Sequence, residues 1–244
     1  MRLDVVTLFP EAVAAALDFS IMARARESGA VSFAAVNPRD WASDRHRIVD
    51  DAPYGGGAGM VLKPEPLVAC IEELVAGEDV PVVLMTPQGE PLTQAVAQRL
   101  ASHDRLVVVC GHYEGLDERV RELVVTEEIS IGDYVLTGGE LPALVLIDAV
   151  VRLLPGAVGN EESPANDSFS DGLLEHPHYT RPAEFRGLKV PEALTQGHHE
   201  QVRRWRRQQS LLRTWRRRPD LLGRAELSDE DRELLNEALE EHGA

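Results

Sequence analysis

Residues 107–140 read VVVCGHYEGLDERVRELVVTEEISIGDYVLTGGE, and this stretch decides the fold. It contains three glycine-bearing turns, at Cys110–Gly115, Ser130–Tyr134 and Thr137–Glu140. A fourth turn, Thr86–Gly89, closes the strand-like run Val82–Met85. Glycine lets backbone approach a ligand closely, and ligands of α/β sheets lie beyond the carboxyl ends of the strands. The four turns predict one pocket walled by loop backbone, although their spacing also fits ordinary connections in a tight α/β domain.

Strands and helices alternate over the first 155 residues. The predicted strands are Leu3–Phe9, Val31–Val36, Val80–Met85, Leu106–Cys110 and Val124–Ile129. The predicted helices between and after them are Glu11–Ser28, Pro64–Ala76, Pro91–Ser102, Leu116–Leu123 and Leu141–Leu154. This alternation is typical of a mostly parallel sheet covered on both faces, so an open doubly wound sheet is the generic expectation.

The alternation stops near Pro155, and the pattern divides the chain at this point. We expect an α/β domain over 1–158, a flexible linker over 159–171 that is polar and rich in breakers, and a small all-helical domain over 172–244. Beyond the linker no segment reads as a convincing strand. Helices are predicted at Pro191–Thr195, Glu200–Trp215 and Ser228–His242.

Composition indicates a soluble cytoplasmic protein. The chain of 244 residues has 43% hydrophobic and 27% charged residues, enough apolar material for a core. No apolar stretch reaches the length of a membrane span, and the N-terminus reads as a strand rather than a signal peptide. Cys70 and Cys110 lie in apolar surroundings without a C-x-x-C motif, which favours buried reduced thiols.

A basic segment stands out against the net charge of −16. Eight arginines and no acid lie within sixteen residues, at positions Arg203, Arg204, Arg206, Arg207, Arg213, Arg216, Arg217 and Arg218. Val202, Trp205, Leu212 and Trp215 form an apolar stripe at helical period, which predicts that the arginines fan outward. Such a segment favours phosphate binding, and the alternative is a solvated basic face.

Several common motifs are missing. Neither a G-x-G-x-x-G nor a G-x-x-x-x-G-K-[ST] is present, which argues against dinucleotide and P-loop sites. His176, His178, His198 and His199 match no zinc template, so surface or structural roles are favoured over metal binding and no metal ligand is predicted.

The amino-acid sequences of these turns resemble those of the bacterial tRNA (guanine-N1)-methyltransferases of the knotted, or SPOUT, superfamily. The resemblance is carried by Gly111–Val120 (GHYEGLDERV) and by Ser130–Pro142 (SIGDYVLTGGELP). It extends across the chain to Leu8–Pro10, Asp51–Met60, Asp167–Leu174, His176–Pro182 and Arg203–Arg206. The family usually has arginine where this chain has His112, so a family side-chain contact at that position is in doubt.

The resemblance implies a deep trefoil knot in the N-terminal domain, with S-adenosylmethionine bound there. Its expected contacts are Thr86, Pro87, Gln88, Gly89, Gly111, Tyr113, Glu114, Gly115, Ser130, Ile131, Gly132, Asp133, Tyr134, Val135, Leu136, Gly138 and Gly139. Glu114 would favour the sulfonium cation or contact the target guanine, although a lone loop acid is more often solvated. The resemblance further implies a homodimer with a shared active site and a dependence on Mg²⁺.

The resemblance also assigns the chemistry. Guanine N1 carries a proton and becomes a nucleophile only when a base removes it. Asp167 matches the family's general base, and Arg152 matches an arginine that stabilises charge on guanine O6. Ser163 is expected to help hold the base. From the residues alone, Asp167 is also a common turn former and Arg152 a cation near a helix C-terminus.

Together these observations predict a methyltransferase acting on N1 of guanosine 37 in tRNA, next to the anticodon. The C-terminal domain is expected to grip tRNA through Arg203, Arg207 and Arg217. The alternatives are a knotted methyltransferase acting on another RNA base, and a non-catalytic RNA-binding relative.

Overall fold

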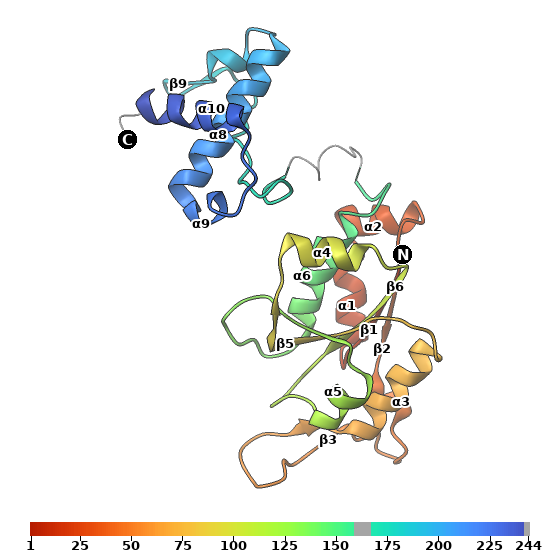
Figure 1. Cartoon of the computed structure of the whole chain (residues 1–244). Helices are drawn as coiled ribbons and strands as arrows, with labels where there is room; N and C mark the ends of the chain where they lie inside the picture. Colours follow the sequence, from red (N-terminus) through yellow and green to blue (C-terminus); the bar gives the residue numbers. More distant parts are fainter. Residues whose placement is uncertain (159–166, 242–244) are drawn as a thin grey trace. The chain divides into compact units, whose positions relative to one another are not determined.

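The chain forms two compact units, Met1–Glu161 and Glu162–Ala244 (Figure 1). The computed structural model describes residues 1–158 and 167–241. No helix among them combines the length and apolar character needed to cross a membrane. Each unit has its own hydrophobic core, and each is described by itself below.

A five-stranded sheet forms the centre of the first unit, and all of its strand pairs are parallel. The strands are β1 (Arg2–Val6), β2 (Ser32–Val36), β5 (Val82–Pro91), β6 (Arg105–Cys110) and β7 (Glu127–Ser130). Their order across the sheet is β2-β1-β6-β5-β7. The predicted parallel sheet is thus confirmed, and all five predicted strand runs are present with shifted ends.

Helices cover both faces of this sheet (Figure 1). Side chains alternate along each strand, so Val83 and Met85 enter one core while Val82 and Leu84 enter the other. The first core also contains residues of α1 (Pro10–Ala16), α2 (Ser20–Glu27), α4 (Gln94–Ala101) and α6 (Glu140–Val151). The second contains residues of α3 (Pro64–Val75) and α5 (Glu118–Val124). The first unit is therefore a three-layer α/β/α domain.

A buried carboxylate forms an ion pair between two neighbouring strands of the sheet. Asp4 in β1 is fully buried, and its carboxylate accepts hydrogen bonds from Arg105 Nε in β6 at 2.9 Å and from Arg2 at 2.9 Å. Burial of an unpaired carboxylate costs free energy, so the burial of Asp4 depends on its pairing with these two guanidinium groups.

The structure corrects the predicted helix Glu11–Ser28, which is two helices. α1 ends at Ala16, and α2 begins at Ser20, whose φ of 53° lies outside the helical region. The predicted helix Pro91–Ser102 is shorter at its start, because Pro91 still belongs to β5 and Thr93 caps Val96 N–H of α4. A short hairpin of β3 (Asp50–Asp51) and β4 (Val61–Leu62), and the 3₁₀ turn η1 (Pro38–Trp41), were not predicted.

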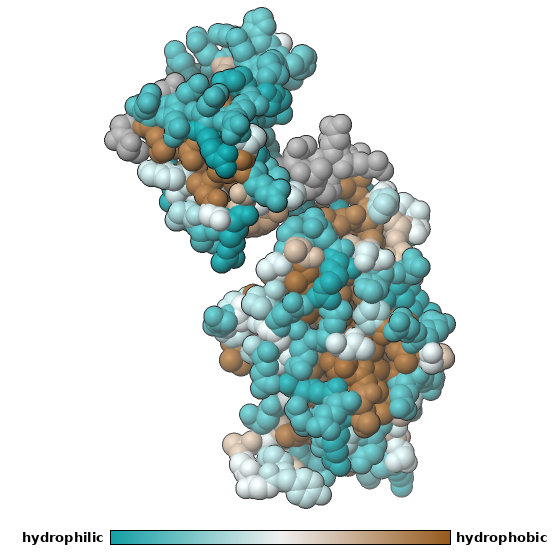
Figure 2. Space-filling model, in the orientation of Figure 1, coloured by the Kyte–Doolittle hydropathy of each residue, from teal (hydrophilic) through white to brown (hydrophobic). Residues whose placement is uncertain are grey.

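The second unit is built on two helices that pack against each other, α8 (His199–Arg217) and α10 (Asp229–Glu241). Leu173, Leu211 and Leu234 form its core. η2 (Glu192–Leu194) and α9 (Pro219–Leu222) complete its helical elements among the described residues. Most of its visible surface is hydrophilic (Figure 2).

The second unit is not all-helical as predicted. β8 (Glu184–Phe185) and β9 (Leu188–Lys189) pair antiparallel across a two-residue turn. Arg186 and Gly187 both have positive φ, at 51° and 82°, which is the geometry that a two-residue hairpin favours.

Candidate active site

A cavity of about 280 Å³ lies beside the middle of β5 and the ends of β6 and β7. Its walls come from residues 84–88 of β5 and from the turns that follow β6 and β7, so segments far apart in the sequence meet in one place. This is the edge of a parallel sheet at which ligands bind. The single pocket expected from the glycine-bearing turns is therefore present in the first unit.

The first wall is a bulge inside β5. Met85 and Glu90 both pair with Ile129 of β7, so the residues between them leave the ladder before the strand resumes, and Thr86, Pro87 and Gln88 line the cavity. The strand therefore does not end at Met85 as predicted. Gly89 lies so close to β7 that a Cβ there would be 2.3 Å from the backbone of Glu128 and Ile129. Only glycine fits this approach without moving one of the strands.

The second wall is a close crossing of two turns. Gly139 N–H donates to Gly111 O at 2.8 Å, and a Cβ on Gly139 would lie 2.7 Å from Cys110 Cα. Gly111 itself has open space where a Cβ would stand. The backbone of Gly139 is thus pressed against β6, while the neighbouring Gly111 leaves room in the cavity.

Aromatic rings and the half-buried acid Glu140 lie beside this contact. His112 contacts Phe9 and Tyr113, with ring centroids 5.3 and 4.9 Å apart. Its Nδ1 atom is buried without a hydrogen-bond partner among the described residues. Glu140, the first residue of α6, accepts a hydrogen bond from Thr7 Oγ1 at 2.8 Å. His112 thus brings an unsatisfied polar atom to the lining of the cavity.

The glycine-rich segment Asp51–Met60 reaches the same rim. Glu114 N–H donates to Met60 O at 3.0 Å, and a Cβ on Gly59 would meet the Glu114 carboxylate at 2.3 Å. Glu114 is exposed, and its side chain lies over Gly59. Two segments that carry the family resemblance therefore meet at one lining residue of the cavity.

Arg121 is a lining residue that the sequence did not reveal. Its guanidinium donates to Gln88 Oε1 at 2.5 Å, to Glu128 at 2.9 Å and to Thr86 Oγ1 at 3.4 Å. Arg121 lies on α5, so it fastens the β5 bulge to β7 from outside the sheet. Only its proximity to three polar groups in space marks this role, and no sequence spacing signals it.

The predicted cofactor contacts fall mostly on this cavity. Fifteen of them line it: Thr86, Pro87, Gln88, Gly111, Tyr113, Glu114, Gly115, Ser130, Ile131, Gly132, Tyr134, Val135, Leu136, Gly138 and Gly139. Gly89 and Asp133 do not line it. Thr137 and Pro142 line it as well.

The two predicted catalytic residues belong to different units. Arg152 is the C-terminal cap of α6 in the first unit, and Asp167 lies in the second unit, where its backbone carbonyl accepts from Ser170 N–H at 3.2 Å. Ser163 and most of the predicted linker lie outside the described residues. Both cysteines are free and buried, as expected, and burial raises the pKa of the Cys70 thiol to about 12.

The arginines of α8 are not all turned outward. Arg203 and Arg204 pair with Glu230, and Arg203 also pairs with Glu200. Arg207 pairs with Asp171 and with Asp231, whose side chain is 8% exposed. The Arg207 guanidinium lowers the pKa of Asp231 to about 2. Arg218 also pairs with Asp220, so four of the eight arginines form ion pairs with acids.

The other face of α8 differs. No ion pair between described residues involves Arg206, Arg213 or Arg217, which lie on one side of the helix at spacings of seven and four. Arg213 reaches the backbone oxygen of Glu175 at 3.3 Å. The predicted apolar stripe is also partly wrong, because Trp215 is 39% exposed and Leu211 is the fully buried residue of this turn.

The whole chain is similar to known proteins of one kind. The family profile of tRNA (Guanine-1)-methyltransferase TrmD matches residues 1–224. A curated relative from Moorella thermoacetica, named tRNA (guanine-N(1)-)-methyltransferase, is 58% identical, covering 100% of this chain and 98% of its own length. Relatives of the same name from Pelotomaculum thermopropionicum and Brevibacillus brevis are 58% and 57% identical, and each alignment covers at least 96% of both chains. The chain belongs to the tRNA (guanine-1)-methyltransferase TrmD family.

Proposed function

We propose that this chain is a tRNA methyltransferase that transfers a methyl group from S-adenosylmethionine to N1 of guanosine 37, next to the anticodon. The observation that carries the proposal is full-length similarity to proteins named for methylation of guanine N1 in tRNA, in a chain whose expected contacts converge on one cavity. The cavity has the size of a small-molecule site.

The cavity fits the proposed cofactor by its chemistry. Its walls are mostly turn backbone, whose N–H and C=O groups can read the edge of an adenine. Gly111 has open space where a Cβ would stand, so a ligand can approach the backbone closely at this point of the lining. S-adenosylmethionine, when bound, supplies an electrophilic methyl group on a sulfonium centre. Glu114 at the rim offers a carboxylate that would attract that positive charge.

The deep trefoil knot of the family is part of the proposal. Gly139 N–H donates to Gly111 O, so the chain that follows β7 returns to the backbone at the end of β6. This close return of one segment onto another supports the proposal, and a Cβ at Gly139 would separate the two segments because it would lie 2.7 Å from Cys110 Cα.

For the reaction, we propose Asp167 as the base that takes the proton from guanine N1. Arg152 would stabilise the negative charge that then develops on O6. Arg152 and Asp167 belong to different units of the chain. On the family resemblance, we propose a homodimer in which the target base binds between the pocket of one protomer and the second unit of its partner. Ser163 is proposed to hold the base, and Mg²⁺ to be required, with no ligand assigned here. Cytoplasmic localisation remains part of the proposal.

The test is the modified nucleoside formed on tRNA. The full chain, S-adenosylmethionine and an unmodified tRNA transcript with guanosine 37 are incubated, and the digested nucleosides are identified by mass spectrometry. We expect 1-methylguanosine, and none with a transcript carrying adenosine 37. A different methylated nucleoside would support action on another RNA base, and tRNA binding without methylation would support a non-catalytic relative.

The roles of Asp167 and Arg152 are tested by single-turnover rates. Asp167→Ala should slow methyl transfer by about 10²–10⁴-fold, the usual contribution of a general base, with cofactor affinity within a few-fold of the parent chain. Arg152→Ala should slow it by about 10²–10³-fold. Asp229→Asn, which removes a carboxylate that is 99% exposed in the same unit as Asp167, is the matched control and should be neutral. A normal rate for Asp167→Ala would refute its role as the base.

A further inference from the structure

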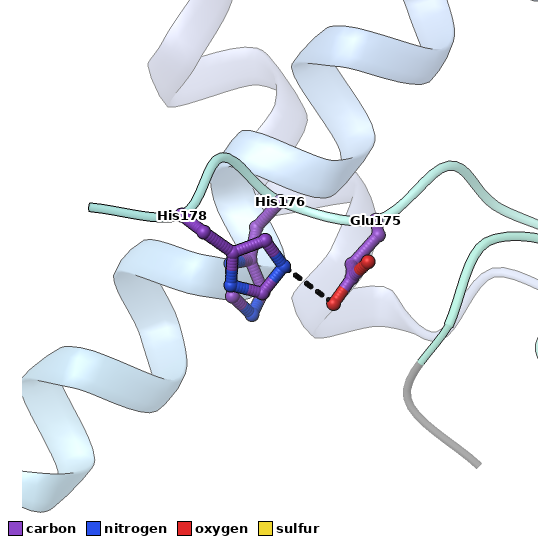
Figure 3. Close-up of side chains that lie close together, drawn as sticks. All are labelled: Glu175, His176 and His178. Atoms are coloured by element: carbon purple, nitrogen blue, oxygen red, sulfur yellow. Dashed lines mark hydrogen bonds and ion pairs between the residues drawn. The ribbon is translucent and has the colours of Figure 1, made fainter. Parts of the chain in front are cut away.

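Three side chains of the kind that bind metals cluster in the second unit. Glu175, His176 and His178 each offer one atom, and these atoms lie within 4.8 Å of one another. Figure 3 shows the carboxylate of Glu175 pointing at the His178 ring, which overlaps the ring of His176. Glu175 Oε1 and His178 Nε2 are 2.6 Å apart, and the two imidazole centroids are 4.7 Å apart.

The backbone that carries this cluster is fastened to α8 on both sides. Before it, Leu174 N–H donates to Thr214 Oγ1 at 2.9 Å, and Leu174 O accepts from Ser210 Oγ. After it, the ring of Tyr179 packs against Trp205 with centroids 6.2 Å apart. The three side chains are thus held together by a fixed backbone, which reduces the entropy that a ligand must overcome.

One ring nitrogen of His176 has a lone pair that is available to bind a metal ion. Its Nδ1 lies 3.2 Å from Pro177 O, which can only accept, so Nδ1 carries the proton and Nε2 has the free lone pair. Histidines that bind metals usually have their second nitrogen fixed in this way.

We propose that Glu175, His176 and His178 bind one divalent transition-metal ion of the zinc class. Two imidazoles and one carboxylate form a ligand set found in zinc sites that keep an open position for water. The ion would take the place of the hydrogen bond between His178 Nε2 and Glu175, and the neutral His178 ring would carry its one proton on Nδ1. Mg²⁺ prefers oxygen ligands in an octahedron, so it would compete poorly here.

The charges around the cluster limit the affinity. Arg206 and Arg213 of α8 face it, the first through its charge on His176 and the second through its bond to Glu175 O. These two guanidinium charges repel a cation bound at the cluster and therefore weaken its binding. We therefore expect binding in the micromolar rather than the nanomolar range, and Arg206→Gln should strengthen it.

The test uses the full chain and Zn²⁺ alone, with a chromogenic chelator as competitor and circular dichroism to verify folding. We expect one ion per chain, at least about tenfold weaker binding in His176→Gln and in His178→Gln, and no displacement by millimolar Mg²⁺. The matched control is the pair His198→Gln with His199→Gln, two exposed histidines at the start of α8. With Co²⁺, the parent chain and the control variant should show the visible absorption typical of a four- or five-coordinate ion, and the His176→Gln and His178→Gln variants should not.

Two outcomes would overturn the site. Equal binding in the His178→Gln variant and the parent chain would show that the cluster holds no ion, and loss in the His198 and His199 control would place the ion there. Weaker binding in Arg206→Gln would contradict the charge argument. The assay contains neither tRNA nor a methyl donor, so its result is independent of the proposed function.

Discussion

The two faces of α8 should respond differently to the loss of arginine, and the face without ion pairs should bind tRNA. We expect that replacing Arg206, Arg213 and Arg217 together with glutamine removes three phosphate contacts. Each contact contributes about 0.7–0.9 to the slope of log affinity against log salt, so the slope should flatten by about 2–3. The same relation gives a loss of roughly 10²-fold at about 0.1 M salt, which shrinks toward 1 M.

The comparison variant is Arg203→Gln with Arg207→Gln, because these side chains are already paired with acids. Without Arg207, the buried carboxylate of Asp231 loses the partner that holds its pKa at about 2 instead of 3.8. Hydrogen bonds with Ser228 contribute to the same shift, so the loss of Arg207 should cost less than the full equivalent of the shift, which is about 2 kcal/mol of stability. This variant should therefore lower the unfolding free energy of the second unit and leave the salt slope for tRNA nearly unchanged.

Filter binding of one tRNA transcript across a series of salt concentrations measures the slope, and urea unfolding measures stability. The reasoning would be refuted if the Arg203 and Arg207 variant flattened the slope while the other variant did not. That result would mean that these arginines leave their carboxylates for phosphates, as the sequence alone suggested.

Three further expectations follow from the geometry. Gly139→Ala should lower the unfolding free energy by about 1–3 kcal/mol, because its Cβ would lie 2.7 Å from Cys110 Cα. Gly111→Ala faces open space, so it should leave the thermal unfolding midpoint unchanged and weaken cofactor binding, which calorimetry measures. Because the pKa of Asp231 is lowered, its stabilisation is complete above about pH 4 and is lost as pH falls toward 2, so Asp231→Asn should flatten the acid limb of a stability curve. Arg121→Gln should loosen the β5 bulge and weaken cofactor binding about tenfold without changing the salt slope for tRNA; unchanged calorimetric affinity would contradict this.

The hydrophobic pattern predicted the sheet well and its irregularities poorly. Leu106–Cys110 is a continuous apolar run, so a buried parallel strand follows from it directly. The bulge of β5 is different, because polar residues interrupt the run and the pairing of Glu90 with Ile129 depends on a partner about forty residues away. The β8–β9 hairpin was missed because only Gly187 marks its turn, while Arg186 adopts a positive φ that its residue type does not favour.

The same limit applies to the site. The glycine-bearing turns could be read one by one, and their convergence followed from the rule for strand ends. Arg121 could not be found, since its partners lie on other elements and no spacing encodes them. The ion pairs of Arg207 were missed for the same reason, because Asp171 and Asp231 are 36 and 24 residues away. The sequence predicted the local turns, but it did not predict interactions between residues far apart in the chain.

The strand order also determines when neighbouring strands can pair while the chain is being translated. β1 leaves the ribosome first, but its inner neighbour is β6, about a hundred residues later, and the buried Asp4 meets Arg105 only then. At about 5–20 residues per second, the edge of β1 waits roughly 5–20 seconds for that partner. During this interval β1 and β2 form at most a parallel pair with an open hydrogen-bonding edge. The nascent chain is thus most vulnerable to aggregation before β6 emerges, and a pause in translation upstream of Arg105 would prolong that exposure.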